Sequence, residues 1–183
     1  MKMLNAIILA FLVCAIDTSV GAEGNIPQGA QEFADKFFYE IVAEELHAEH
    51  SNTFNLNPDS ENITFGPLYE QYYVTSEFIT EKNPDLSKGI GPSNEYLAVV
   101  YQDGKPVNVI GTNKNEAGLF ELSTFGFSYE LAQKMGKFKG GEIMLFEGPV
   151  DAWYTFNGKK LKPLNDNAKE LMKEKNLLAN IKK

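Results

Sequence analysis

The chain has 183 residues, of which 43% are hydrophobic and 12% aromatic, enough for one domain with a substantial core and too few for two comfortable ones. Its formal net charge is -8 and all 17 basic residues are lysines, so nucleic acid, which needs a basic face and favours arginine, is not an expected partner. The single cysteine is Cys14, which argues against a disulfide framework, a thiol nucleophile or a cysteine-ligated metal in the mature protein.

The first 22 residues have the pattern of a secretory signal peptide. Lys2 precedes an apolar run over residues 6–16, and small residues lead up to Ala22. The run is shorter than the roughly 20 residues that span a bilayer. We therefore expect cleavage after Ala22, a single secreted or periplasmic domain over residues 23–183, and no membrane span after cleavage. A lipoprotein acylated at Cys14 is the weaker alternative, because no small residue directly precedes that cysteine.

Residues 28–50 are predicted to form an amphipathic helix. Apolar side chains recur every four residues and form one broad stripe. The stripe consists of Phe33, Phe37 and Ile41 with Ala34, Phe38, Val42 and Leu46.

His47 and His50 stand three residues apart near the predicted end of this helix. On a helix that spacing puts both rings on one face, where they could hold a divalent metal together with Glu44. The alternative is a solvated helix end, which we favour because two imidazoles alone rarely make a metal site. No cofactor is predicted.

Residues 51–61 are rich in turn-forming residues and are predicted to be an exposed loop. Asn62-Ile63-Thr64 follows and matches the N-glycosylation pattern. Residues 65–80 are rich in aromatic and β-branched residues, so we predict a long strand that becomes regular after Pro67.

A hairpin is predicted over residues 95–112, with its turn at Asp103-Gly104. A two-residue type I′ turn and a three-residue loop with a bulge are both possible there. We prefer the second, because it places Leu97, Val99 and Tyr101 on the same face as Val107 and Val109. Pro106 cannot donate a ladder hydrogen bond, so the returning strand is expected to start at an edge or a bulge.

The remaining segments predict further strands and two helices. Strands are expected over residues 119–123, 142–147, 150–156 and 160–164, a short helix over 127–135 closed by a left-handed Gly136, and a last helix over 167–181 capped by Asn167. Strands and helices do not alternate as a parallel sheet requires. The predicted fold class is therefore α+β, with an antiparallel sheet of about five to seven strands on which the N-terminal amphipathic helix and the C-terminal helix pack.

Trp153 lies in one of these strands, with alternating aromatic neighbours. One face of the strand is expected to be core, and the other could join Tyr69 and Tyr73 in an aromatic groove for a ligand. Packing on both faces is the alternative, and we favour it because a sheet covered by helices has no aromatic surface to spare.

No catalytic motif is complete. Gly126-Phe127-Ser128-Tyr129-Glu130 lacks the final glycine of a nucleophile elbow, and both histidines precede Ser128, contrary to the α/β-hydrolase order. Residues 107–111, with the sequence VNVIG, resemble the Q-x-V-x-G loop of the cystatin protease inhibitors, whose helix followed by antiparallel strands is also similar. The order of elements further resembles extracellular sensor domains of the PAS type.

These observations favour a secreted or periplasmic, non-catalytic binding or interaction domain. Its partner is expected to be a small molecule or a protein, and its oligomeric state is not predicted. The alternatives are an unrecognised extracytoplasmic hydrolase and, from the resemblance, a cystatin-like protease inhibitor.

Overall fold

An eight-stranded sheet forms the centre of the computed structural model, which describes residues 26–74, 90–139, 143–156 and 161–181. The strands are β1 (Ile63–Phe65), β2 (Tyr69–Val74), β3 (Ile90–Gln102), β4 (Lys105–Lys114), β5 (Phe120–Phe125), β6 (Ile143–Glu147), β7 (Ala152–Phe156) and β8 (Leu161–Pro163). The α-helices of these ranges are α1 (Gln28–Leu46), α3 (Tyr129–Met135) and α4 (Asp166–Ile181), and short 3₁₀ helices are η1 (Ser51–Phe54) and η2 (Gly148–Val150). The fold class is α+β.

The strands lie in the order β5-β4-β3-β2-β6-β7-β8, and β1 pairs with β3 beside this path. All neighbours are antiparallel except β2 and β6, which are parallel. The sheet is therefore mostly antiparallel and has one strand more than the predicted range. The extra strand is β1, which shares only Phe65 with the predicted long strand of residues 65–80 and is separated from β2 by Gly66 and Pro67. The end of that prediction, residues 75–80, lies outside the described residues.

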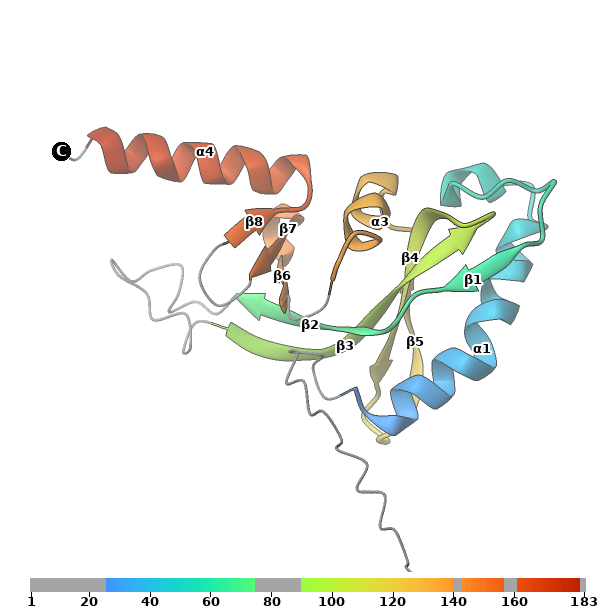
Figure 1. The fold of residues 1–183 in the computed structure, drawn as a ribbon. Coiled ribbons are helices and arrows are strands. Elements are labelled where there is room, and N and C mark those ends of the chain that lie inside the picture. The colour runs from blue at the N-terminus through green and yellow to red at the C-terminus, as the bar shows by residue number, and fades with distance from the viewer. Residues whose placement is uncertain (1–25, 75–89, 140–142, 157–160, 182–183) are drawn as a thin grey trace, which may run out of the picture.

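The helices cover the two faces of the sheet at different places. Glu70 and Tyr72 on β2 share a face with Tyr96 on β3 and with Leu145 and Tyr154 on β6 and β7, because these residues follow one another across the strands. On this face α1 packs over β3, β4 and β5, and α4 packs over β7 and β8. The two helices lie at opposite ends of the sheet (Figure 1). The opposite face carries α3.

Helix α1 forms as the periodic stripe predicts but ends earlier. Phe38, Val42 and Leu46 are buried against the sheet. The helix stops at Leu46, whereas the prediction extended to residue 50. Its last turn contains no basic residue, and carboxylates there oppose the helix dipole. The chain instead turns through η1, whose Phe54 packs against the apolar cluster between α1 and the sheet.

The β3–β4 hairpin turns at the predicted residues but in the other geometry. Asp103 and Gly104 both have positive φ angles, 51° and 73°, and Gln102 is paired with Lys105, which is a two-residue type I′ turn rather than the preferred three-residue loop. Tyr101 is paired with Pro106 but Val100 is paired with Asn108, so Val107 is the extra residue of a β-bulge. Val107 packs with the apolar cluster between α1 and the sheet.

The prediction for the hairpin faces holds for Leu97, Val99 and Val109, which lie together under α3, and is wrong for Val107. The bulge lies beside Pro106 because proline has no N–H to give to the ladder.

The residues that cap helices α3 and α4 differ in part from the prediction. Ser128 caps α3 by accepting a hydrogen bond from the Leu131 N–H (3.3 Å). Gly136 after α3 is right-handed, with φ -61°, so the predicted left-handed cap is wrong. The side chain of Asn165, not that of Asn167, accepts from the α4 backbone, at Ala168 N (3.2 Å).

Candidate functional site

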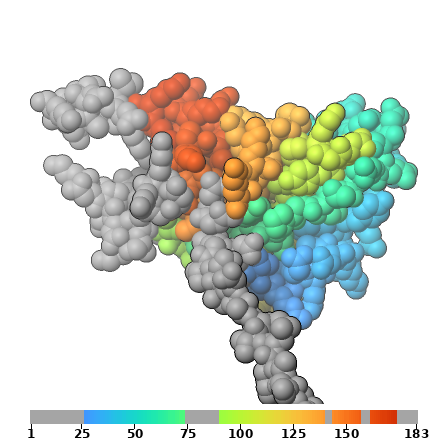
Figure 2. All heavy atoms as spheres, viewed as in Figure 1, coloured from blue at the N-terminus to red at the C-terminus, as the bar shows by residue number. Residues whose placement is uncertain are grey.

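A groove runs between α1 and the segment that carries β1. Its volume is about 430 Å³. One wall is the side of α1 that faces β1, and the other wall is the extended chain from Ile63 to Leu68, with Ala98 of β3 beneath. The two segments lie directly alongside each other on the molecular surface (Figure 2). The lining residues are Gln31, Ala34, Asp35, Phe38, Tyr39, Ile63, Thr64, Phe65, Gly66, Leu68 and Ala98.

The floor of the groove is apolar and rigidly packed. Phe38 of α1 is fully buried, and its ring lies 5.7 Å from that of Phe65. Ala34, Ile63 and Leu68 are also buried members of the cluster between α1 and the sheet. A preformed apolar floor of this kind is typical of ligand sites.

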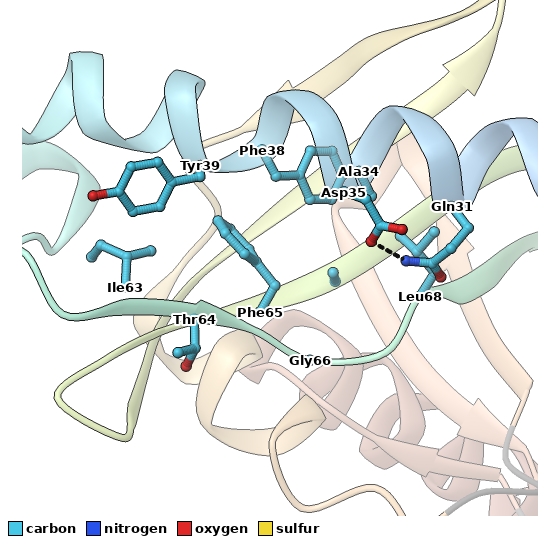
Figure 3. A pocket seen from close by; sticks show the side chains of 11 residues that line it. Gln31, Ala34, Asp35, Phe38, Tyr39, Ile63, Thr64, Phe65, Gly66 and Leu68 are labelled. Carbon is cyan, nitrogen blue, oxygen red and sulfur yellow. Dashed lines mark hydrogen bonds between the residues drawn. The ribbon is translucent and has the colours of Figure 1, made fainter.

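The rim of the groove is polar and exposed. Gln31, Asp35 and Tyr39 follow one another at intervals of four along α1, which aligns them on one side of the helix. The Gln31 Nε2 donates a hydrogen bond of 2.7 Å to Asp35 Oδ1, and the Tyr39 side chain reaches over the groove near Ile63 (Figure 3). Tyr39 is 50% exposed. An apolar floor below convergent polar groups gives the groove both affinity and orientation for a ligand.

A second, more open groove of about 450 Å³ lies on the other flank of α1. Phe33 and Phe37 of the helix line it together with Leu119 and Phe120 at the start of β5. Lys36 Nζ lies 4.8 Å from the centre of the Phe37 ring. Of the two lysines that line this groove, Lys36 and Lys114, the first is already engaged with an aromatic face.

The predicted aromatic site is not a groove at Trp153. The indole is 2% exposed, stacks on Phe146 with ring centres 4.2 Å apart and meets the edge of Phe127 at 5.3 Å. Its Nε1 donates to Asp151 Oδ1 at 3.0 Å. The favoured packing interpretation of Trp153 is confirmed by this burial.

Tyr69 and Tyr73 lie on the same face of the sheet as Trp153. Tyr69 packs against Phe138, with ring centres 5.3 Å apart, while Tyr73 is 47% exposed and lies over Gly91. A ligand-binding role for these two tyrosines stays a prediction.

The predicted metal residues lie at the end of α1 and just beyond it. His47 Nε2 lies 3.9 Å from Glu61 Oε1, and His50 Nε2 lies 3.2 Å from Glu45 Oε2, so the two imidazoles face different carboxylates. Glu44 is exposed. Within the described ranges, no three His, Cys, Asp or Glu side chains are grouped so that they could hold a metal ion. This geometry supports the favoured interpretation, a solvated helix end.

The buried polar side chains of the hairpin serve the fold. Gln102 donates to the backbone oxygens of Asn57 and Ser60 (2.8 and 2.7 Å) and accepts from Asn57 N (2.8 Å), which fixes the loop before β1. Asn108 donates to Phe54 O at 2.6 Å. Buried polar groups satisfied by backbone in this way have a structural explanation and need no catalytic one.

The two other sequence candidates also have structural positions. The VNVIG segment lies inside β4, where Asn108, Val109 and Ile110 are fully buried. It does not form the exposed loop that the resemblance to cystatins implies. Ser128 is the cap of α3.

Sequence reasoning missed the rim of the α1–β1 groove. Its only signal is the row Gln31, Asp35 and Tyr39, polar or amphipathic residues four apart beside the apolar row that begins at Ala34. The row alone does not predict a groove, because the opposite wall is a strand far along the chain.

No helix of the described residues combines the length and the apolar character needed to cross a membrane. No protein-family model matches the sequence, and neither a curated protein nor a solved structure is significantly similar to the chain. The function is therefore inferred from the geometry of the molecule alone.

Proposed function

We propose that the protein is a secreted or periplasmic, non-catalytic binding domain whose ligand occupies the groove between α1 and β1. The observation that carries the proposal is the combination of a packed apolar floor with the exposed row of Gln31, Asp35 and Tyr39. The signal-peptide pattern of residues 1–22 supports the location. The incomplete catalytic motifs of the sequence favour a binding role over catalysis.

The experiment is a fragment screen by ¹H–¹⁵N NMR on the mature chain, residues 23–183, with aromatic, sugar and dipeptide fragments. Ligands of the groove should shift the amides of Ile63, Phe65 and the facing side of α1. Ala34→Leu places extra side-chain volume in the floor and should weaken these ligands at least tenfold. Ala43→Leu, the same change on α1 away from the groove, should leave affinity unchanged.

Two results would overturn the proposal. Fragments that bind elsewhere, or that ignore Ala34→Leu, would remove the groove as the site. Robust turnover in a screen of ester, glycoside, peptide and phosphate substrates would show an enzyme instead. The location is tested separately by N-terminal sequencing of secreted material, which should begin at Glu23.

A further inference from the structure

We propose that the α1–β1 groove binds an extended, basic peptide segment, which pairs with the outer edge of β1 as an added strand. This inference rests on the proposed function and names the class of its ligand. Strand addition uses backbone hydrogen bonds for affinity and side-chain pockets for specificity, and the groove provides both.

The outer edge of β1 presents backbone groups without partners among the described residues. Gly66 N donates to Val99 O (2.9 Å), and Asp103 N donates to Asn62 O (3.0 Å). Hydrogen-bonded positions alternate in an antiparallel pair, so the backbone groups of Asn62, Thr64 and Gly66 face β3. Ile63 and Phe65 then point their backbone groups away from β3, and only the Ile63 N–H is used locally, by Glu61 O (2.9 Å).

The groove reaches this free edge. Ile63 and Phe65 extend their side chains toward α1, whereas the Thr64 side chain lies on the other side of the strand (Figure 3). Thr64 also lines the groove, so the groove follows β1 along its whole length. A peptide in the groove would pair with the outward-facing N–H and C=O of Phe65.

The helix wall and the part of the other wall that carries β1 are both long enough for a short strand. From Gln31 to Tyr39 the helix rises about 12 Å, at about 1.5 Å per residue. From Ile63 to Gly66 an extended chain covers about 10 Å, at about 3.3 Å per residue. A strand of about four residues fits between them, with alternate side chains directed toward the apolar floor and toward solvent.

Charge selects the sequence of the peptide. Asp35 is the only ionisable carboxylate or lysine among the lining residues, and the chain as a whole carries a net charge of -8. A lysine or arginine in the peptide can pair with Asp35 at the exposed rim, and the net charge attracts a basic segment and repels an acidic one.

The test uses a defined probe, the acetylated and amidated pentapeptide Lys-Val-Thr-Val-Lys, and the ¹⁵N-labelled mature chain. Binding should shift the Phe65 amide proton downfield and slow its hydrogen exchange, because that N–H gains a hydrogen bond. The matched control is the same peptide with alternate backbone amides N-methylated. Two such peptides are made, one with the odd and one with the even amides methylated. Each keeps the side chains but loses one hydrogen-bonding edge, and one of the two should bind at least tenfold more weakly than the unmethylated peptide.

A pair of variants tests the charge. Asp35→Lys should weaken the basic peptide at least threefold at low salt and strengthen Glu-Val-Thr-Val-Glu. Glu32→Lys is the matched control, since Glu32 is exposed on α1, accepts a 2.7 Å hydrogen bond from Gln28 just as Asp35 does from Gln31, and lines the other groove. It should leave the preference between the two peptides unchanged.

The outcomes separate this inference from the proposed function. Equal binding of all N-methylated peptides, or shifts at Leu119 and Phe120 in place of Phe65, refutes strand addition. Absence of peptide binding, with fragments that still bind and are blocked by Ala34→Leu, refutes the inference and leaves the binding function intact. If neither peptides nor fragments perturb the groove, both fail.

Discussion

The surroundings of Trp153 and the α1–β1 groove are both built from aromatic and aliphatic side chains of a strand and a neighbouring element, yet only the groove has space for a ligand. Around Trp153 the Phe146 ring stacks at 4.2 Å and Phe127 closes the side. In the groove the Phe38 and Phe65 rings pack with each other, and about 430 Å³ remains open beside them. The aromatic residues of β7, a strand that is paired on both sides, belong to the core. The groove lies beside β1, which among the described residues is paired on one side only.

The largest expected effect is that of Trp153→Ala. Loss of an enclosed indole should lower the free energy of unfolding by about 3 to 5 kcal/mol, measured by urea denaturation. Tyr129→Ala, which truncates a residue that is 49% exposed, should cost far less. The wild-type emission should be blue-shifted and shielded from acrylamide. A red-shifted, readily quenched emission would place the indole in a ligand site and reverse the comparison.

The next effect concerns the polar link that fixes the Trp153 strand to α4. Asn165 Oδ1 accepts from Trp153 N (3.1 Å) and Ala168 N (3.2 Å), and its Nδ2 donates to Asp151 O (2.6 Å). Asn165→Ala leaves these groups without the amide, so we expect a loss of about 1 to 3 kcal/mol in the free energy of unfolding.

Asn167→Ala is the control for this link. Its side chain is exposed and donates weaker bonds to Val150 O (3.1 Å) and Asp151 O (3.2 Å). We expect a loss below about 1 kcal/mol. Equal losses for the two variants would show that Asn165 has no special role in joining β7 to α4.

A smaller effect is expected at alkaline pH, at two phenols on the face shared by α1 and α4. Burial and the nearby Glu70 carboxylate raise the pKa of Tyr72 to about 12. The Tyr72 hydroxyl donates a hydrogen bond of 2.8 Å to that carboxylate. Burial and the nearby Glu147 raise the pKa of Tyr154 to about 12 as well. Both values lie above the ordinary 10.0, so the neutral phenols stabilise the fold below about pH 10, and this stability is lost as the pH rises through 12.

Absorbance at 295 nm should show two tyrosines that ionise only near pH 12 in the folded protein. Tyr72→Phe and Tyr154→Phe should each remove one of them and reduce the loss of stability above pH 10. Complete titration of the phenols by pH 10.5 in the folded chain would contradict the burial of this face.

Local patterns predicted the elements well, and long-range pairing accounts for what they missed. The apolar spacing of four predicts that Phe38 and Val42 are buried, because helical periodicity depends only on neighbouring residues. The Asp103-Gly104 turn is equally local. The missing N–H of Pro106 predicted an edge or a bulge at the start of the returning strand, and the structure has a bulge there. The parallel pair of β2 and β6 joins segments that are distant in the chain, so it could not be predicted from a local pattern.

The groove illustrates the same limit. Asp35 and Tyr39 are visible in the sequence as a polar row on α1, but the wall that completes the site is β1. Residues 63–65 precede Gly66 and Pro67, and a strand of three residues before such a break has no pattern of its own. Its existence depends on the pairing with residues 100–102 of β3, which only the folded chain provides.

The smallest expected effect tests a third region, the C-terminal end of α1, which resembles the groove rim in being exposed. We expect a chelator to leave the melting temperature unchanged. His47 and His50 each face a separate carboxylate, at 3.9 Å and 3.2 Å, and a metal site needs ligands that converge on one point. Differential scanning fluorimetry with and without EDTA measures this, and His47→Ala is the control variant. A drop in melting temperature with EDTA that disappears in His47→Ala would show that these side chains can converge after all, and would make the end of α1 a second binding site on the same helix as the groove.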